Sequence, residues 1–207
     1  QYPMGKSYVN RVLIKMNNGP GWINVPIMGK SDKKKINEVE INNTLPWKAK
    51  LIKTVELVYK KSPYSDWLLP ELREILRVEY CRLIELNVAL IKFLCKKSGI
   101  ATRFLISGEM KGINDSPEHR LPYLVNQIGG TVYLSGSGKG SRRYVDENSF
   151  NRSGIELKFQ QFIHPIYPQL HGDFVANLSF IDLLFNCGPK SLEVLSSKVG
   201  NSVTKQS

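Results

Sequence analysis

The residues best suited to do chemistry lie in the segment Phe159–His171, where His164, Tyr167 and Gln169 follow a predicted strand in a stretch stiffened by prolines. Loops at the ends of strands often carry catalytic and binding side chains. Histidine is the residue type whose ordinary pKa lies nearest to neutral pH, so His164 could act as a general base. The alternative is a histidine that bonds to the backbone in a structural corner.

A second segment reads Ser-Gly-Ser-Gly-Lys-Gly-Ser over residues 135–141, between a predicted strand and a short predicted helix. Its glycines let the backbone approach a ligand, and successive N–H groups can bind an anion. In a parallel sheet this loop lies at the carboxyl end of a strand, where ligands bind. Ser135, Gly136 and Gly138 are therefore candidate contacts for a phosphate or a sugar. An ordinary flexible connection is the alternative, because the spacing matches neither common nucleotide-binding glycine motif.

The charge balance predicts an anionic ligand or surface. The 207 residues carry 29 Lys and Arg against 18 Asp and Glu, a net charge of +11. Arg11, Lys15 and Arg120 are candidate anion contacts, although a surface ion pair is the commoner role of an arginine. The sequence has neither zinc-finger spacing nor an RNP-like strand, so a phosphate-bearing small molecule is favoured over nucleic acid. Alternatively, the positive charge belongs to a solvated Lys-rich surface that binds no specific ligand.

Other classes of site find little support in the sequence. His119, His164 and His171 show no metal-ligand spacing, and we expect neither a metal nor a cofactor. The three cysteines form no Cys-x-x-Cys pair, which agrees with a reducing compartment. No run of 18 apolar residues and no export leader is visible, so we expect a cytoplasmic protein without a membrane span.

The elements that must position these residues fall into three parts of one predicted domain, residues 1–195, followed by a flexible tail, 196–207. Residues 1–43 are β-rich, with predicted strands at 8–14, 22–27 and 36–41. Residues 47–98 are helical, with predicted helices at 47–60 and 67–97, the second breaking near residues 78–80.

Residues 100–195 alternate between strands and helices. The predicted strands are 102–106, 131–135 and 155–159, and the predicted helices are 117–128 and 146–152. Such alternation predicts right-handed crossovers, so we expect an α/β fold with a parallel, Rossmann-like sheet flanked by helices.

A set of motifs covers nearly the whole chain and is most specific in its last third. They are Asn10-Arg11, Trp22–Pro26, Ile36–Ile41, Arg120-Leu121, Tyr133–Gly136, Tyr144–Glu147, Gly154-Ile155, Phe159-Gln160, His164–Leu170 and Asn177–Gly188. Together they resemble the WbqC-like family of bacterial surface-polysaccharide gene clusters. Members typically begin with a segment similar to His-Gln-Pro-x-Tyr-x-Pro, which this chain lacks, and have a Lys-His pair where this chain has Lys50-Leu51. Either departure could mean lost activity, a ligand site completed by another chain, or an incomplete sequence.

The resemblance implies a sugar-tailoring transferase of O-antigen biosynthesis that acts on a nucleotide- or lipid-linked sugar, with acyl or aminoacyl transfer as the specific reaction. It implies that Asp182 or Gln160 orients His164, and that Asn10 and Tyr144 join the substrate-binding residues. A non-catalytic binding or regulatory protein of a glycan cluster is the alternative, and a nucleic-acid binder is the least favoured. A homo-oligomer stays open.

Overall fold

The computed structural model describes residues 8–29, 34–113, 116–143 and 145–197. The chain divides into two compact units, the first made of residues 1–101 and 164–198 and the second of residues 102–163 and 199–207. Each unit has a buried apolar cluster of its own. The predicted single domain spans both units and stays a prediction. Of the predicted tail, only Ser196 and Ser197 belong to the described residues.

The first unit opens with an antiparallel hairpin, β1 (Arg11–Met16) and β2 (Gly19–Asn24). The two predicted strands are confirmed as a pair, but both begin three residues away from their predicted starts. The turn is only Asn17-Asn18, because the Gly-Pro-Gly stretch that predicted a longer turn belongs to β2. Gly21 fits there since a Cβ would lie 2.6 Å from the sulfur of Met16.

The predicted strand at residues 36–41 is wrong in its first half. Ile36–Glu38 forms a 3-10 helix (η1), because the Glu38 carboxylate accepts the backbone N–H of Lys35. Only isolated bridges follow, Ile41 with Ile27 and Glu40 with Arg82. The alternation of apolar residues was nevertheless informative, since Val39 and Ile41 are buried.

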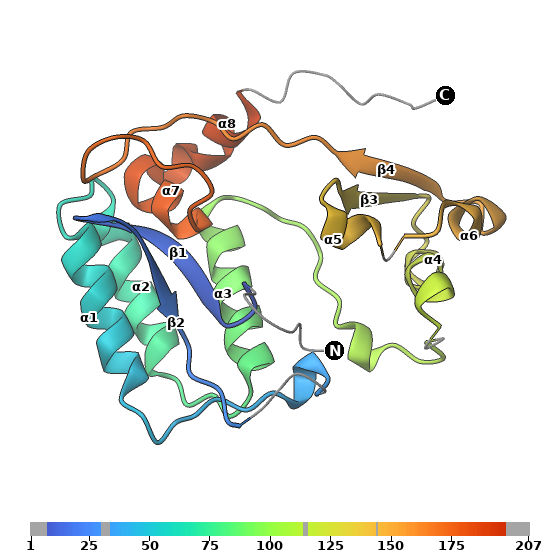
Figure 1. Ribbon diagram of the computed structural model, residues 1–207, viewed down its shortest axis with the longest axis horizontal. Helices are drawn as coiled ribbons and strands as arrows, with labels where there is room; N and C mark the ends of the chain where they lie inside the picture. The colour runs from blue at the N-terminus through green and yellow to red at the C-terminus, as the bar shows by residue number, and fades with distance from the viewer. Residues whose placement is uncertain (1–7, 30–33, 114–115, 144, 198–207) are drawn as a thin grey trace. The chain divides into compact units, whose positions relative to one another are not determined.

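Helices build most of the first unit (Figure 1). They are α1 (Trp47–Tyr59), α2 (Ser65–Arg77), α3 (Leu83–Lys97), α7 (Phe180–Cys187), the 3-10 helix η3 (Gly188–Lys190) and α8 (Ser191–Ser196). The predicted helix before residue 60 and the predicted break in the long helical region are confirmed, the break falling at residues 78–82. The core of this unit consists of apolar side chains from the hairpin and the helices, among them Ile14, Val55, Leu68, Leu72, Leu76, Leu86, Leu184 and Phe185.

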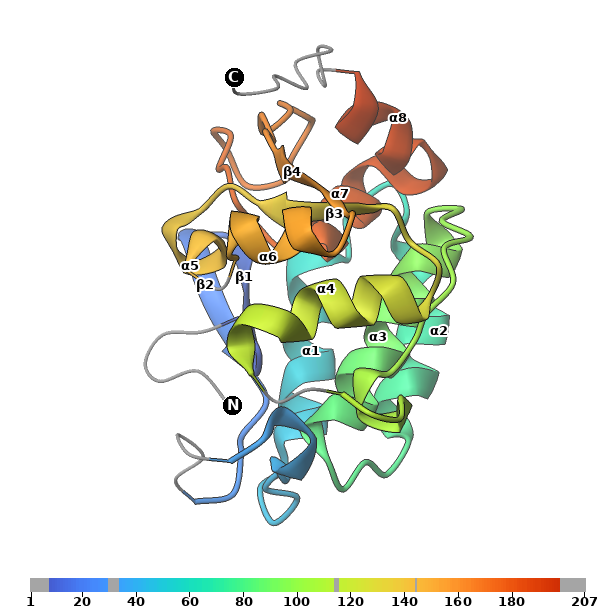
Figure 2. The same cartoon turned by 90° about the vertical axis from the view of Figure 1, so that its right-hand side faces the viewer.

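The second unit contains two parallel strands, β3 (Val132–Gly136) and β4 (Glu156–Gln160). Its helices are η2 (Ser107–Glu109), α4 (Pro117–Gln127), α5 (Lys139–Arg142) and α6 (Glu147–Arg152), with α4 and α6 packed against each other and against the strands (Figure 2). Val125, Phe150 and Ile155 form its core, and the ring of Tyr133 stacks on Phe150. The strands and helices predicted over residues 117–159 are confirmed to within about two residues.

The α/β class is confirmed, but a Rossmann-like sheet is not. Among the described residues the parallel sheet has two strands only, because the predicted strand at residues 102–106 has no strand conformation. Its side chains Phe104, Leu105 and Ile106 are all exposed instead of alternating between a buried and an exposed face. These residues have a high strand propensity but do not form a strand, because no neighbouring strand or helix in the described part of the chain buries their side chains.

Candidate functional site

The first unit buries the carboxylate of Asp182, which lies in the first turn of α7 and is 1% exposed. The hydroxyl of Tyr59 donates to its Oδ1 at 2.8 Å, and the hydroxyl of Tyr167 donates to its Oδ2 at 2.9 Å. The side-chain amide of Asn186 donates to Oδ2 at 3.3 Å and to the Asp182 carbonyl at 2.7 Å. We call these four residues, together with Lys15, the Asp182 centre.

Lys15 supplies the positive charge of this centre. It lies on β1, is only 2% exposed, and its ammonium donates to the carbonyl oxygens of Gly172 at 2.8 Å and Asp173 at 2.5 Å. A buried charge needs partners of this kind, because leaving water costs several kcal/mol per ion. Lys15 is therefore committed to backbone carbonyls and to the field of Asp182.

Burial sets the protonation behaviour of the centre. Loss of solvation raises the pKa of Asp182, although the hydroxyls of Tyr59 and Tyr167 and the charge of Lys15 act in the opposite direction. The pKa values of both tyrosines are raised above their ordinary values, first by burial and then by the Asp182 charge. The phenols consequently keep their protons and serve as donors to the carboxylate.

The segment that follows His164 is fixed by its own polar side chains. Gln169 bonds both backbone groups of Val175, donating to its carbonyl and accepting its N–H, each at 2.9 Å. The Nε2 of His171 lies 2.9 Å from the carbonyl oxygen of Val58, and His171 has a φ of 63°. Gln169 was a predicted substrate contact, and here its amide closes a loop.

One contact of His164 is consistent with a particular tautomer of its ring. Its Nδ1 lies 2.9 Å from the carbonyl oxygen of Pro165, and since a carbonyl can only accept, Nδ1 carries the proton. In the neutral ring the lone pair is then on Nε2. The imidazole packs near the rings of Tyr167 and Phe174, with centroids 6.2 and 5.7 Å away. Tyr167 thus touches His164 through its ring and Asp182 through its hydroxyl.

The predicted anion contacts on the hairpin face different partners. Arg11 places its guanidinium carbon 4.3 Å from the centroid of the Trp22 ring, a cation–π contact. Asn10 donates its side-chain amide to the carbonyl of Val25 at 3.1 Å, next to the last pair of the hairpin. Of the predicted anion contacts on the hairpin, Lys15 belongs to the Asp182 centre, whereas Arg11 contacts the ring of Trp22.

The glycine loop of the second unit, residues 135–141, begins at the carboxyl end of β3 as predicted. Gly136 pairs with Gln160, the last residue of the neighbouring strand β4, and a Cβ on Gly136 would lie 2.8 Å from the Ser141 hydroxyl. Gly138 caps α5 with extended backbone. The structure therefore brings Ser135, Gly136, Gly138 and Gln160 to one end of the two strands.

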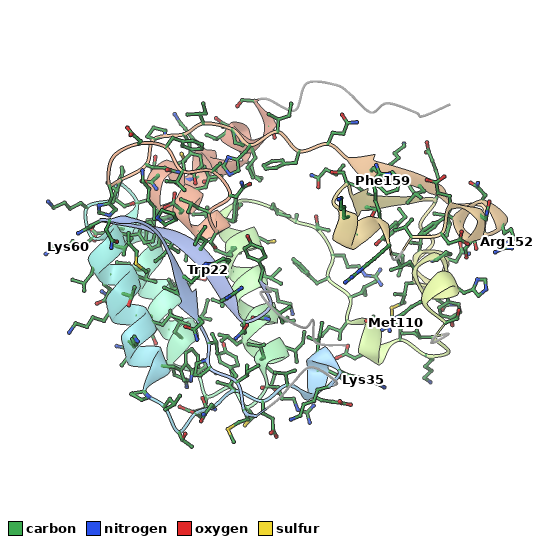
Figure 3. All side chains as sticks on the ribbon, viewed as in Figure 1. Trp22, Lys35, Lys60, Met110, Arg152 and Phe159 are labelled. Atoms are coloured by element: carbon green, nitrogen blue, oxygen red, sulfur yellow. The ribbon has the colours of Figure 1, made fainter. Side chains whose placement is uncertain are left out.

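Arg142 is held at the same end. Its Nε donates to the Ser137 carbonyl at 3.2 Å, and its guanidinium carbon lies 4.2 Å from the centroid of the Phe159 ring. Phe159 sits on β4, and Figure 3 marks its position at this end of the second unit. Cationic groups over exposed backbone are suited to a phosphate or carboxylate.

Two predicted contacts lie elsewhere. Arg120 is an exposed residue in the middle of α4, and Tyr144 lies outside the described residues. Sequence reasoning missed Tyr59, Asn186 and Arg142. Tyr59 ends α1, and nothing in the sequence distinguishes it from an ordinary aromatic residue of that helix. The four-residue spacing from Asp182 to Asn186, in contrast, could have indicated a side-chain bond along one helix.

The residues at 8–29, 34–113, 116–143 and 145–197 also bear on metal binding and on membrane insertion. No three His, Cys, Asp or Glu side chains there gather closely enough to hold a metal ion. None of the helices in these ranges combines the length and the apolar composition needed to cross a lipid bilayer.

Comparison with known proteins places the chain in a family. No solved structure matches this chain. A relative from Mycobacterium tuberculosis (strain ATCC 25618 / H37Rv), Uncharacterized protein Rv1507c, is 32% identical over 196 residues, which cover 92% of this chain and 82% of the relative. The model of the WbqC-like protein family matches residues 1–194. The chain therefore belongs to the WbqC-like protein family.

Proposed function

We propose that this protein is a cytoplasmic sugar-tailoring transferase of bacterial surface-polysaccharide biosynthesis, acting on a nucleotide- or lipid-linked sugar. The reaction is the transfer of an acyl or aminoacyl group to an amino sugar. The family resemblance supports the pathway, since it points to polysaccharide gene clusters. The glycine loop supports the substrate class, because both kinds of linked sugar carry phosphate groups.

The arrangement around Arg142 is the observation that carries the proposal. Gly138 and Gly140 leave the backbone of the loop open, since no atom lies within 4 Å of where a Cβ on either glycine would be. Arg142 and Lys139 are exposed and belong to the short helix that follows. Backbone N–H groups and two cations at the carboxyl end of parallel strands suit a phosphate group of the substrate.

A separate assignment, which concerns the first unit alone, makes His164 the base of the chemical step. The amine nitrogen of the sugar attacks the acyl carbon of an ester or thioester donor. A nitrogen–carbon bond forms while the bond from that carbon to the donor oxygen or sulfur breaks. The Nε2 of His164 takes the proton of the amine and returns it to the departing oxygen or sulfur, so atoms and charge balance. Asp182 and Tyr167 act as positioning residues.

A thermal-shift screen against UDP-, dTDP- and GDP-linked sugars, together with a polyprenyl-diphosphate-linked sugar, tests the substrate class. A ligand at about 100 times its Kd adds about 2.7 kcal/mol of stability, which raises Tm by about 2 °C or more. Arg142→Ala should weaken binding by about tenfold or more, since it removes a charge-assisted contact. Arg152→Ala is the matched control, an exposed arginine of the same unit paired with Asp146 at 3.8 Å. No shift with any of these ligands, or an equal loss in both variants, contradicts the proposal.

The catalytic assignment needs its own test. His164→Gln keeps a polar side chain of similar length but removes the base, so ligand binding should persist while turnover falls by about a hundredfold or more. Unchanged turnover in folded His164→Gln would remove His164 from the mechanism and leave the binding proposal intact.

A non-catalytic ligand-binding protein is the second candidate. It is favoured by the way the polar groups around Asp182 and Gln169 satisfy one another, as in a structural network. In that case the thermal-shift screen finds a ligand, and no acyl donor in any combination gives turnover.

A further inference from the structure

An exposed aromatic group on the hairpin of the first unit takes no part in the chemistry described above. Trp22 is 42% exposed although it is large and apolar, and Tyr8, 66% exposed, lies beside it with ring centroids 5.4 Å apart and planes inclined by 51°. Arg11 lies over the Trp22 ring at 4.3 Å. We call Tyr8, Arg11 and Trp22 the hairpin platform.

The register of the hairpin extends this platform by one polar side chain. Arg11 pairs directly with Asn24, so the two side chains share one face of the hairpin. Trp22 and Asn24 are two residues apart on β2 and are both exposed, hence they lie on that same face. One face therefore presents the exposed indole ring of Trp22 with the Tyr8 ring tilted beside it, a guanidinium group and an amide that can both donate and accept.

The other two tryptophans of the chain have different surroundings. Trp47 is 6% exposed and donates its indole N–H to Asn43 at 3.1 Å. Trp67 is half-buried and covered by the ammonium of Lys97 at 4.7 Å. Those two contribute to the core and its edge, whereas Trp22 is 42% exposed.

We infer that the hairpin platform binds the nucleobase of a nucleotide-linked sugar. The base stacks on the exposed ring of Trp22, with the tilted ring of Tyr8 beside it. The Asn24 amide meets a polar edge of the base, and Arg11 contacts the phosphate next to the nucleoside. Every nucleobase has a π-face that stacks on exposed aromatic rings, and an adjacent arginine suits the phosphate. The inference rests on the proposed function and narrows it, because a polyprenyl-linked sugar contains no flat ring for this surface.

Tryptophan fluorescence of the full chain tests the platform directly. UDP, dTDP and GDP are titrated separately, and polyprenyl diphosphate serves as the probe without a nucleoside. One nucleotide should quench the emission as it binds. Trp22→Thr, which keeps a residue suited to a strand, should lose the quenching and weaken binding by about tenfold to a hundredfold, the range for one stacked base. Trp67→Phe is the control and should retain both.

A second variant, Tyr8→Ala, allows the inference to be tested even if Trp22→Thr fails to fold. Tyr8→Ala removes an exposed ring and should weaken nucleotide binding by about threefold or more, since it contributes a smaller part of the stacking surface. Its melting curve should match that of the wild type.

The outcomes separate this inference from the function on which it rests. If the wild type binds a nucleotide and Trp22→Thr and Tyr8→Ala bind it equally well, the platform is overturned while the nucleotide-linked substrate stands. If the wild type binds only polyprenyl diphosphate, the platform is overturned and the lipid-linked form of the proposed function stands. Binding of neither probe overturns both.

Discussion

The Asp182 centre and the glycine loop are both polar, yet they differ in their relation to water. At the Asp182 centre, Lys15 and Asp182 are 2% and 1% exposed, and each has several partners within the chain. In the glycine loop the residues from Gly136 to Arg142 are all exposed. The first arrangement is a desolvated network, and the second is an open surface with one anchored arginine.

Desolvation decides what each arrangement can contribute. A buried polar group that loses its partner suffers a desolvation penalty, so the bonds of the Asp182 centre act mainly on the free energy of unfolding. Exposed groups are hydrated in the folded and the unfolded chain alike, so their removal has little effect on the free energy of unfolding and acts mainly on binding. The predicted site residues therefore fall into two groups. Those that are buried stabilise the fold, and those that are exposed are available to a ligand.

Two glycines extend the contrast to the backbone: Gly188, which caps the helix α7 that carries Asp182, and Gly138 of the glycine loop. Gly188 has a φ of 55°, and a Cβ there would lie 2.3 Å from ring atoms of Tyr64, whereas Gly138 has nothing within 4 Å. Gly188→Ala should lower the free energy of unfolding by about 4 kcal/mol, from the left-handed backbone and overpacking together. Gly138→Ala should leave it within about 0.5 kcal/mol. Urea unfolding of both variants measures the difference, and equal losses would break the comparison.

Lys15→Met should have the next largest effect. The substitution leaves Asp182 without its positive neighbour and the Gly172 and Asp173 carbonyls without the ammonium, a loss of about 3 kcal/mol in unfolding free energy. Lys60→Met, at an exposed lysine, is the matched control and should change stability by less than about 0.5 kcal/mol. A stable Lys15→Met protein with impaired ligand binding would instead assign Lys15 to the substrate, as its residue type first indicated.

Sequence patterns predicted the helical part of the first unit well because local signals and packing agree there. The apolar stripe of Leu68, Leu72 and Leu76 is buried in the core, and the helix break falls where the pattern weakened. Residues 102–106 have the same kind of local signal for a strand but no packed neighbour strand. Strand formation needs a partner distant in sequence, which a single segment cannot reveal.

The position of a candidate site residue was predictable where that residue belongs to a local sequence motif. The position of residues 135–138 after a strand followed from alternation alone, and β3 ends there. The partners of Asp182 did not follow, because Tyr59 is 123 residues away in sequence and looks like an ordinary apolar residue of α1. Lys15 resembled an anion contact by residue type, and only the fold reveals that carbonyl groups surround its ammonium.

Tyr59→Phe tests the hydrogen bonds of the Asp182 centre and their dependence on pH. Removing the hydroxyl that donates to Oδ1 should cost about 2 kcal/mol at neutral pH, the usual value for a bond to a charged group. The folded pKa of Asp182 is raised above its ordinary value of 3.8, so its contribution to stability is greatest below that pH and falls as the pH rises through the folded pKa. Tyr59→Phe raises this pKa further and should steepen the fall.

Urea unfolding of wild type and Tyr59→Phe on both sides of this range gives the measurement. The difference between them should shrink in acid, where Asp182 is protonated. Asp182→Asn, which cannot titrate, is the reference background in which Tyr59→Phe should show no such pH dependence. A difference independent of pH would mean that the hydroxyl does not act through the carboxylate.

Glu71→Gln tests whether burial, and not membership of the first unit, decides how much a polar side chain stabilises the protein. Glu71 belongs to the first unit but its side chain is 35% exposed. It pairs with Lys96 and Lys97, each at 3.0 Å. Hydrogen bonds from Lys97 and then Lys96 lower the pKa of Glu71 below its ordinary value of 4.5, so its contribution is present above that pH and lost as the pH falls through the folded pKa. Solvent screens this exposed pair, and the loss at neutral pH should be about 0.5 kcal/mol.

Urea midpoints at neutral and acidic pH, each at low and high salt, measure this small term. The effect of Glu71→Gln should vanish in acid and diminish in salt, while that of Lys15→Met should persist in salt because its partners are buried. If Glu71→Gln costs as much as Tyr59→Phe, then membership of the first unit, and not burial, decides how strongly a polar group stabilises this protein.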